Sequence, residues 1–324
     1  MFEIEVRKGV DFRDFKVLAK NRALAYRHCH IESDAWIDWK FNKSPFSPAL
    51  VALVRNEESE IIACNAYGIL EYKREQEVYR IAMPYETFVL DGFQGVGLFG
   101  KMLHEIGNEA KHHSIDGLLF FPNHQSLNSL RRNEHWEELK APIRYLIKPK
   151  FSIKNLVKMP DIRMNFVSLR GNGLVRNFDF KEKFFVESNQ ILHLNSGAKY
   201  LDWRFNSPTQ NLYRKFSGAF SEVLIREGTR GRLKEAQIVF VRRSSGCQNP
   251  AFKDELEKTI SILLNEFDLI GMPISGNDEI HKTFKSMGFI SLHSRTNVFF
   301  QSINGNLGAV SNDLRLSGLD FHTY

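Results

Sequence analysis

The spacing of apolar residues in the first 150 positions predicts a mixture of helices and antiparallel strands. Phe12, Phe15 and Ala19 recur at steps of three and four, which predicts an amphipathic helix over residues 12–27. Apolar, β-branched and aromatic stretches then predict three strands, a glycine-rich turn, a helix, a short strand, a second helix and a last strand. We expect strands at 49–55, 60–72, 78–90, 117–121 and 144–147, and helices from the turn to about residue 113 and from 123.

The second half repeats this order more loosely. Its pattern predicts strands at 219–226, 236–241 and 269–272, and helices at 252–267 and from 277.

A short motif is shared by the two halves. Asp-Trp-(Lys/Arg)-Phe-Asn occurs at 38–42 and at 202–206, each time followed by Ser-Pro within a few residues. A five-position match that includes tryptophan is hard to obtain by chance in a chain with 4 tryptophans. A second, weaker similarity relates segments 123–136 and 277–289, since both begin with asparagine and end with an aromatic residue. The chain therefore reads as two copies of one unit.

The most informative segment is glycine-rich and runs from Glu86 to Leu103 as a strand, a turn and a helix start. Its glycines let the backbone approach a ligand, and the helix N-terminus adds unpaired N–H donors and partial positive charge. Such a turn can hold a pyrophosphate. It is not a P-loop, because no Gly-Lys-(Ser/Thr) follows, and its glycine spacing is not that of a dinucleotide fingerprint. The alternative is a purely structural tight turn, in which the glycines allow the start of the helix to pack closely and no ligand binds.

The order of elements and the segment Gln94-Gly95-Val96-Gly97-Leu98-Phe99 resemble the GNAT acyltransferase superfamily, whose acyl-CoA signature is (Gln/Arg)-x-x-Gly-x-(Gly/Ala). Phe99 departs from the signature, because a small residue is usual there, and Gly100 comes next. The segment 284–289 resembles the family's Tyr-x-x-x-Gly-Phe ending. The first copy has Arg131-Arg132-Asn133-Glu134-His135-Trp136 at that place, so it lacks the tyrosine that often serves as general acid.

The resemblance implies an α+β fold of three layers, with two tandem GNAT-like units, each a mixed, mostly antiparallel sheet flanked by helices. We expect an acyl-CoA-binding domain at 1–150, a linker with the first elements of the second unit at 151–184, and a degenerate, substrate-shaping domain at 185–324. The implied activity is transfer of an acyl group from acetyl-CoA or another acyl-CoA to a primary amine. The alternative is an acyl-CoA-binding sensor or scaffold without catalysis.

The resemblance also implies which residues bind the acyl-CoA. The strand at 78–90 would separate from the strand at 117–121, and the pantetheine arm would lie in this opening and hydrogen-bond the strand backbone near residues 88–90 like an added strand. The amides of the turn would hold the pyrophosphate. The implied cofactor-binding residues are Phe88, Val89, Leu90, Gln94, Gly95, Val96, Gly97, Leu98, Phe99, Gly100 and Asn123. Asn123 is equally suited to cap a helix. The second copy lacks the glycine turn and is expected not to bind acyl-CoA.

Acyl transfer to an amine needs a base, because an amine with a pKa near ~10 is mostly protonated at neutral pH. Glu86 is the candidate, since it precedes the turn on the strand that flanks the expected opening; an exposed strand carboxylate is the alternative. Strand alternation places Tyr85 on the opposite face. In the second half, Arg242 and Arg243 are candidates for pairing with a substrate phosphate, or else form a solvated basic turn.

Composition and charge narrow the class of protein. Hydrophobic residues make up 43% and charged residues 25%, so the chain can bury a core. The 3 cysteines have no paired spacing, and the first residues show no apolar signal segment, so we expect a cytoplasmic protein without a membrane span.

The net charge of +6 falls entirely on residues 151–324. This favours an acidic partner, such as a phosphorylated substrate, an acyl carrier protein or a membrane surface. The alternative is a solvated basic surface without a specific partner. Among acceptor amines, the basic half favours an amino sugar or a nucleotide-linked amino sugar. His28-Cys29-His30 are too close together to converge on one ion, so no metal is expected, and no nucleic-acid recognition motif is visible.

Overall fold

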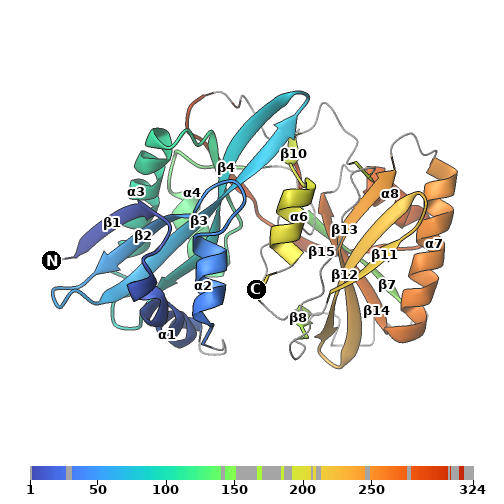
Figure 1. The fold of residues 1–324 in the computed structure, drawn as a ribbon, viewed down its shortest axis with the longest axis horizontal. Helices are drawn as coiled ribbons and strands as arrows, with labels where there is room; N and C mark the ends of the chain where they lie inside the picture. The colour runs from blue at the N-terminus through green and yellow to red at the C-terminus, as the bar shows by residue number, and fades with distance from the viewer. Residues whose placement is uncertain are drawn as a thin grey trace. The chain divides into compact units, whose positions relative to one another are not determined.

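The chain divides into two units, each with its own β-sheet (Figure 1). The first unit comprises Met1–Lys140 with Asn297–Asn312, and the second comprises Ala141–Thr296 with Asp313–Tyr324. In the computed structural model, the described residues are 2–26, 31–139, 143–150, 166–169, 184–185, 192–205, 207–208, 213–244, 249–275, 279–305, 307 and 314–316.

The sheet of the first unit has the strand order β1-β2-β3-β4-β5-β16-β6. Its neighbours are antiparallel except for β4 and β5, which are parallel. The elements are β1 (Glu3–Lys8), η1 (Phe12–Asp14), α1 (Phe15–Tyr26), α2 (Asp34–Phe41), β2 (Leu50–Arg55), β3 (Ile61–Arg74), β4 (Glu77–Val89), α3 (Leu98–His112), β5 (Gly117–Phe120), α4 (His124–Arg131), β6 (Glu137–Glu138) and β16 (Phe299–Ser302).

Helices cover both faces of this sheet, which gives the three layers expected from the sequence. On one face, α1 and α2 pack through Leu18, Trp36 and Phe41 against β2 and β3. On the other face, α3 packs through Met102 and Ile106, because its buried residues recur every three to four positions. The fold class is therefore the predicted α+β arrangement.

The second unit repeats this design around a sheet of order β11-β12-β13-β14-β7-β15, with α7 and α8 packed in its apolar cluster. The elements are β7 (Ile143–Pro149), β8 (Phe166–Ser168), β9 (Phe184–Phe185), β10 (Leu192–Leu194), α6 (Ala198–Phe205), β11 (Tyr213–Ser217), β12 (Ser221–Arg230), β13 (Leu233–Ser244), α7 (Asn249–Glu266), β14 (Leu269–Ser275), α8 (Glu279–Ser286), β15 (Ile290–Thr296) and β17 (Leu314–Arg315).

Matching hydrogen bonds show how closely the two units agree. In the first unit, Asp116 donates its N–H to the Arg80 carbonyl at 2.8 Å and accepts the Arg80 N–H on its side chain at 2.8 Å. In the second, Asp268 donates to the Lys234 carbonyl at 3.0 Å and accepts the Lys234 N–H at 2.9 Å. Each aspartate thus ties the start of the parallel strand to its neighbour, at the same place in each sheet.

In each sheet, one strand comes from a part of the chain that is far in sequence from the strands with which it pairs. β7 follows the first unit in sequence but lies between β14 and β15, whereas β16 lies between β5 and β6. The expectation that 144–147 is the last strand of the first copy is therefore wrong in its place, although the strand exists. An apolar pattern identifies a strand but not its partners, because pairing is decided by contacts far apart in sequence.

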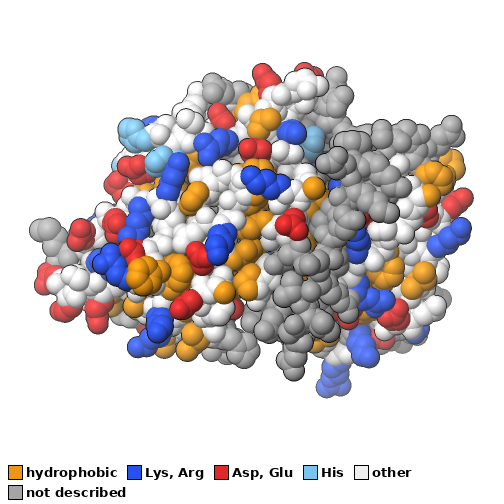
Figure 2. Space-filling model, viewed as in Figure 1, with side chains coloured by type: hydrophobic (Ala, Val, Ile, Leu, Met, Phe, Trp, Pro, Cys, Tyr) orange, Lys and Arg blue, Asp and Glu red, His pale blue; other side chains and the backbone are white. Residues whose placement is uncertain are grey.

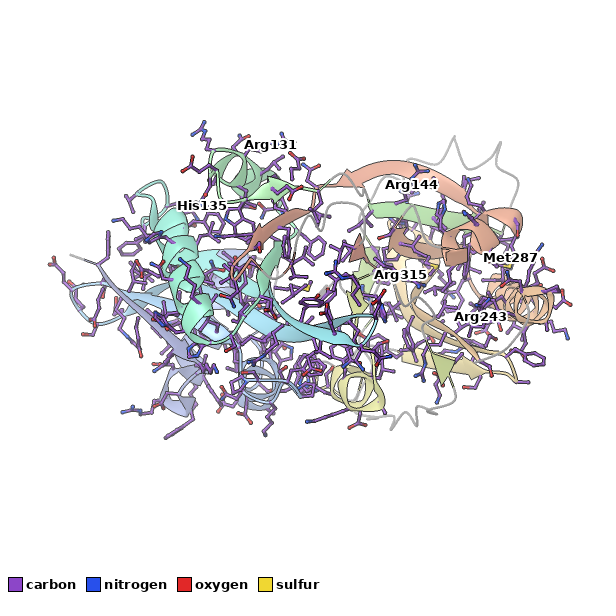
Figure 3. All side chains as sticks on the ribbon, turned by 90° about the horizontal axis from the view of Figure 1, so that it is seen from above. Arg131, His135, Arg144, Arg243, Met287 and Arg315 are labelled. Carbon is purple, nitrogen blue, oxygen red and sulfur yellow. The ribbon has the colours of Figure 1, made fainter. Side chains whose placement is uncertain are left out.

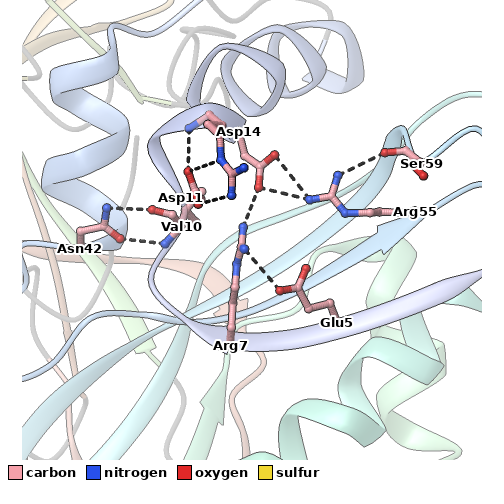
Figure 4. Close-up of polar contacts among 9 residues, drawn as sticks. Glu5, Arg7, Val10, Asp11, Asp14, Asn42, Arg55 and Ser59 are labelled. Carbon is pink, nitrogen blue, oxygen red and sulfur yellow. Dashed lines mark hydrogen bonds and ion pairs between the residues drawn. The ribbon is translucent and has the colours of Figure 1, made fainter.

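The start of the chain is held by a polar network (Figure 4). Asn42, at the end of the shared motif, accepts the Val10 N–H at 2.8 Å and donates to the Val10 carbonyl at 3.1 Å. Asp14 accepts from Arg7 at 2.6 Å and from Arg55 at 3.2 Å. Asn42 therefore anchors the turn after α2. Phe12, expected on the buried face of a helix, lies in η1 with 76% of its surface exposed, because α1 begins only at Phe15.

Candidate functional site

The first unit opens where its parallel strands separate. β4 and β5 pair at Ile81–Gly117 and Ala82–Leu118, and the described pairing ends there although β4 continues to Val89 and β5 to Phe120. Residues 77–120 are all described, so the separation belongs to the strands themselves. Beyond Ala82 no described strand pairs with this edge of β4. Side chains take two of its carbonyls, since that of Thr87 accepts the Tyr26 hydroxyl at 2.6 Å and that of Val89 accepts from Gln94.

A β-bulge at Tyr85 accompanies this separation. Ala66 pairs with Glu86 and Tyr67 with Pro84, so Tyr85 is the extra residue in β4. Its ring lies against Gly68, where any larger side chain would collide with it. Because the bulge interrupts alternation, Tyr85 turns to the same face as Glu86, on the side of α1 and α2. The prediction that these two side chains point to opposite faces is wrong for this reason.

The backbone register shows which groups of β4 face the opening. Leu90 donates its N–H to the Ile62 carbonyl at 2.9 Å and therefore faces β3. Adjacent residues of an antiparallel pair alternate in direction, so Val89 presents its backbone to the opposite side, toward β5. Gln94 donates from Nε2 to the Val89 carbonyl at 3.1 Å. Among the predicted residues 88–90, the N–H that faces the opening is thus that of Val89.

The glycine turn after β4 is open to solvent. Gly92, Gly95 and Gly97 have φ angles of 88°, 79° and 83°, which L side chains rarely adopt. No heavy atom lies within 4 Å of a Cβ built on any of them, so side chains do not fill the turn. Gly97 is the N-cap of α3 and makes no side-chain capping bond. The first amides of α3 are therefore available to an anionic ligand.

Phe99, which departs from the family signature, does not block the turn. Its ring packs edge-on against Phe120 of β5, with centroids 6.1 Å apart, and belongs to the apolar cluster under α3. The side chain points into the core while its backbone stays in the first turn of the helix. The departure therefore leaves the exposed side of the turn unchanged.

Glu86 lies in a buried ion cluster. Only 2% of its surface is exposed, and its Oε2 lies 2.8 Å from Lys40 Nζ and 3.1 Å from Arg22 Nε. Burial alone raises the pKa of Glu86, but the charges and hydrogen bonds of Lys40 and Arg22 outweigh it and hold that pKa below its usual value. A carboxylate with a lowered pKa is a weak base. Its Oε1 has no hydrogen-bond partner among the described residues.

The two cations of this cluster were missed as site residues. Both lie against Trp36 of α2: Arg22 stands 4.9 Å and Lys40 4.5 Å from the ring centroid. Lys40 belongs to the shared motif, whose basic residue in the second unit, Arg204, is also buried. A basic residue repeated between apolar neighbours was the signal for a buried ion pair.

Asn123 caps α4, since its Oδ1 accepts the Ser126 N–H at 3.0 Å. The predicted capping role is confirmed, and its proposed contact with acyl-CoA stays a prediction. Arg131, at the end of α4, binds Glu138 through two hydrogen bonds of 3.0 Å (Figure 3).

The two predicted substrate-binding arginines lie in β13 rather than in a turn. Arg242 is buried and donates from Nε to Glu222 at 2.9 Å. Arg243 donates to Asn249 at the start of α7 and stands 6.0 Å from the Phe252 ring centroid (Figure 3). The solvated-turn alternative is therefore wrong for Arg242. Residues 245–248, where the second copy lacks the glycine turn, lie outside the described residues.

In the second unit β13 and β14 separate in the same way, but another strand pairs with the edge of β13 that this separation leaves. β13 and β14 pair from Glu235–Leu269 to Gln237–Gly271, and β13 runs on to Ser244. There β9 pairs antiparallel with β13 at Arg243 and Ser244. Since β12 takes the other edge of β13, β9 stands on the side that corresponds to the opening of the first unit.

Other predicted features give no further site. Within the described ranges, no three His, Cys, Asp or Glu side chains come together as metal ligands would, and residues 28–30 lie outside those ranges. None of the helices described there has both the length and the apolar character that a bilayer crossing requires. Basic and acidic side chains are interspersed on the face that Figure 2 presents.

Comparison with known proteins identifies the fold. No protein-family model matches the sequence, and no curated protein matches it either. A solved GCN5-related N-acetyltransferase from Anabaena variabilis is similar, with a TM-score of 0.63 at 9% identity over 93% of this chain and 73% of that one. The Saccharomyces cerevisiae N-myristoyltransferase, solved with bound myristoyl-CoA, has a TM-score of 0.55 at 11% identity over 98% of this chain and 84% of its own. The chain therefore has the GNAT fold, and the second likeness extends over both units.

Proposed function

We propose that the first unit binds an acyl-CoA and transfers its acyl group to a primary amine. The observation that carries this proposal is the separation of β4 from β5 beside an open glycine turn. The exposed amides after Gly97 fit a diphosphate, and the Val89 N–H, which faces the opening, fits a carbonyl of an extended pantetheine arm.

The acyl-CoA supplies the reactive thioester, and the protein supplies position and electrostatics. The amine nitrogen forms a bond to the acyl carbon, the carbon–sulfur bond breaks, and CoA leaves as a thiol with the proton that the amine gives up. Glu86 Oε1, buried and without a described hydrogen-bond partner, can accept an N–H of the amine. Removal of the amine proton by Glu86 is a separate prediction.

The test is binding followed by turnover. Acetyl-CoA and myristoyl-CoA should each be compared with CoA by thermal shift, and free thiol should then be measured with a panel of amines. The panel includes amino sugars, nucleotide-linked amino sugars, amino acids and peptides. Stabilisation with thiol release on at least one amine supports the transferase. Stabilisation without release on any of them supports the alternative, an acyl-CoA sensor or scaffold, and no stabilisation rejects both.

The amino-sugar acceptor follows only from the basic second half of the chain. Arg242→Gln and Arg243→Gln test whether either arginine contributes to acceptor binding, with the KM for the acceptor as the measurement. Arg243 is the more informative position, because removing Arg242 leaves the buried Glu222 with the 3.5 Å contact to Lys215 alone among the described residues and lowers stability as well.

We expect the full chain to bind one acyl-CoA, because β9 occupies the corresponding edge of the second unit. Isothermal titration of the 324-residue protein should give a stoichiometry of one. A stoichiometry of two would show that β9 does not exclude the ligand.

A further inference from the structure

Two side chains of β3, Tyr67 and Asn65, are buried beside the opening with unused hydrogen-bonding capacity. Both are 0% exposed, and neither Tyr67 Oη nor Asn65 Nδ2 makes a hydrogen bond of normal geometry with a described residue. A weaker contact from the Asn65 amide to the phenol oxygen leaves the Tyr67 O–H as the unused donor. Leaving such a group unpaired costs about 1–3 kcal/mol, and folded proteins rarely tolerate it without a reason. Both side chains face the α3 side of the sheet, the side on which Tyr67 joins the apolar cluster under α3.

The Tyr67 ring reaches the place where the strands part. Tyr67 pairs with Pro84 of β4, directly before the bulge. Its ring centroid lies 6.3 Å from that of Phe120, which stands two residues past the last β4–β5 pair. Because β4 lies between β3 and β5 in the sheet, the ring must extend across β4 to make this contact.

Both orphan groups are hydrogen-bond donors. Burial raises the pKa of Tyr67, and the Asn65 amide opposes this only in part, so the phenol stays protonated. The Thr87 hydroxyl donates to Asn65 Oδ1 at 2.8 Å and thereby directs the amide so that Nδ2 remains as a donor. Two neutral donors in apolar surroundings suit an uncharged carbonyl oxygen better than a phosphate, whose burial costs far more.

The position along β4 distinguishes between the carbonyl groups of an acyl-CoA. The glycine turn lies beyond the outer end of β4, and the backbone of Val89 comes next. Tyr67, level with Pro84, lies further in, where the far end of an extended arm would be. We propose that Tyr67, with Asn65 beside it, donates a hydrogen bond to the thioester carbonyl oxygen of the bound acyl group.

This inference rests on the proposed function and adds to it a side-chain donor that polarises the thioester carbonyl. The phenol stabilises the oxygen as it gains negative charge, while the nitrogen–carbon bond forms and the carbon–sulfur bond breaks. Tyr67 is therefore assigned as a residue that touches the reacting atoms.

Tyr67→Phe tests the assignment with two ligands. Acetyl-CoA carries the carbonyl oxygen, and its thioether analogue ethyl-CoA lacks it but keeps the rest of the molecule. We expect the wild type to bind acetyl-CoA about tenfold more tightly than ethyl-CoA, as one neutral hydrogen bond allows. Tyr67→Phe should lose this preference through weaker acetyl-CoA binding alone. The carbonyl stretch of bound ¹³C-labelled acetyl-CoA should also move to higher frequency, toward its value in apolar solvent.

Tyr72→Phe is the matched control, because Tyr72 is a second buried tyrosine of β3 whose hydroxyl donates to Met83 Sδ at 3.3 Å. This variant should keep the ligand preference and the carbonyl frequency. Tyr67→Phe should still fold, since the hydroxyl that it removes makes no hydrogen bond of normal geometry with a described residue.

Three results would overturn the proposal. Equal weakening of both ligands by Tyr67→Phe places the hydroxyl on the pantetheine arm, and an unchanged preference removes Tyr67 from the site. In either case the wild type still binds acetyl-CoA, so the proposed function survives. If the wild type binds neither ligand, the proposed function fails together with this inference.

Discussion

Gly97→Trp should abolish acyl-CoA binding by the first unit while the protein stays folded. Gly97 has a φ of 83° and no heavy atom within 4 Å of its built Cβ, so an indole there would project into the space above the turn. That space is where the diphosphate would meet the amides of α3. Losing two or more charge-assisted hydrogen bonds predicts about a hundredfold weaker binding or worse. The measurement is the thermal shift with acetyl-CoA, checked by titration calorimetry.

The strain of the substitution needs its own control. A tryptophan at positive φ costs on the order of 1–2 kcal/mol wherever it is placed. Gly305 belongs to the same unit, has a φ of 70° and is equally open, so Gly305→Trp carries the same strain away from the turn. Gly305→Trp should keep the acyl-CoA shift. If Gly97→Trp keeps it too, the diphosphate does not bind at the turn.

The turn was accessible to sequence reasoning because its signals are local. Glycines at 92, 95 and 97 mark positive φ, and the helix that follows has a regular apolar repeat. β2, β3 and β4 were predicted to within a few residues for the same reason, whereas β1 was missed. The repeated motif marked equivalent places in the two units, because α2 and α6 contain it and begin with equivalent hydrogen bonds from Trp36 to Ser33 and from Tyr200 to Gly197.

The features that shape the opening depend on contacts between distant residues. The bulge at Tyr85 follows from its packing over Gly68, and the places of β7 and β16 follow from partners more than a hundred residues away. In the sequence, Asn65 and Tyr67 are ordinary strand residues. Their burial beside the separation of β4 and β5 depends on the tertiary structure and could not be predicted from the strand pattern. Sequence thus predicted which segments lie at the candidate site, but not how their side chains are directed.

Glu86→Gln should destabilise the first unit strongly. It leaves Lys40 buried without this carboxylate and Arg22 with Glu32 at 3.5 Å, and breaking a buried pair in this way costs about 3–5 kcal/mol. Chemical denaturation at pH 7 measures the loss. Glu58→Gln, at an exposed turn position, is the control and should change stability by no more than about 0.5 kcal/mol.

The pH dependence of stability follows from the same cluster. The folded-state pKa of Glu86 lies below its ordinary value of 4.5. Its contribution to stability is therefore complete above that ordinary value and is lost as the pH falls through the lower folded pKa. Wild-type stability should decline in this acid range more steeply than that of Glu86→Gln. Parallel curves for the two proteins would contradict the ion pairing.

Turnover decides whether the same carboxylate is also the general base. If it is, Glu86→Gln, assayed below its melting temperature, should lose turnover far more than acyl-CoA affinity. Lys40→Met removes the nearest positive charge, and the burial that remains should raise the pKa of Glu86. A general base at Glu86 would then move the acidic limb of the kcat–pH profile to higher pH in Lys40→Met. If folded Glu86→Gln turns over normally and Lys40→Met leaves that limb in place, Glu86 holds α1 and α2 on β4 and takes no part in the proton transfer.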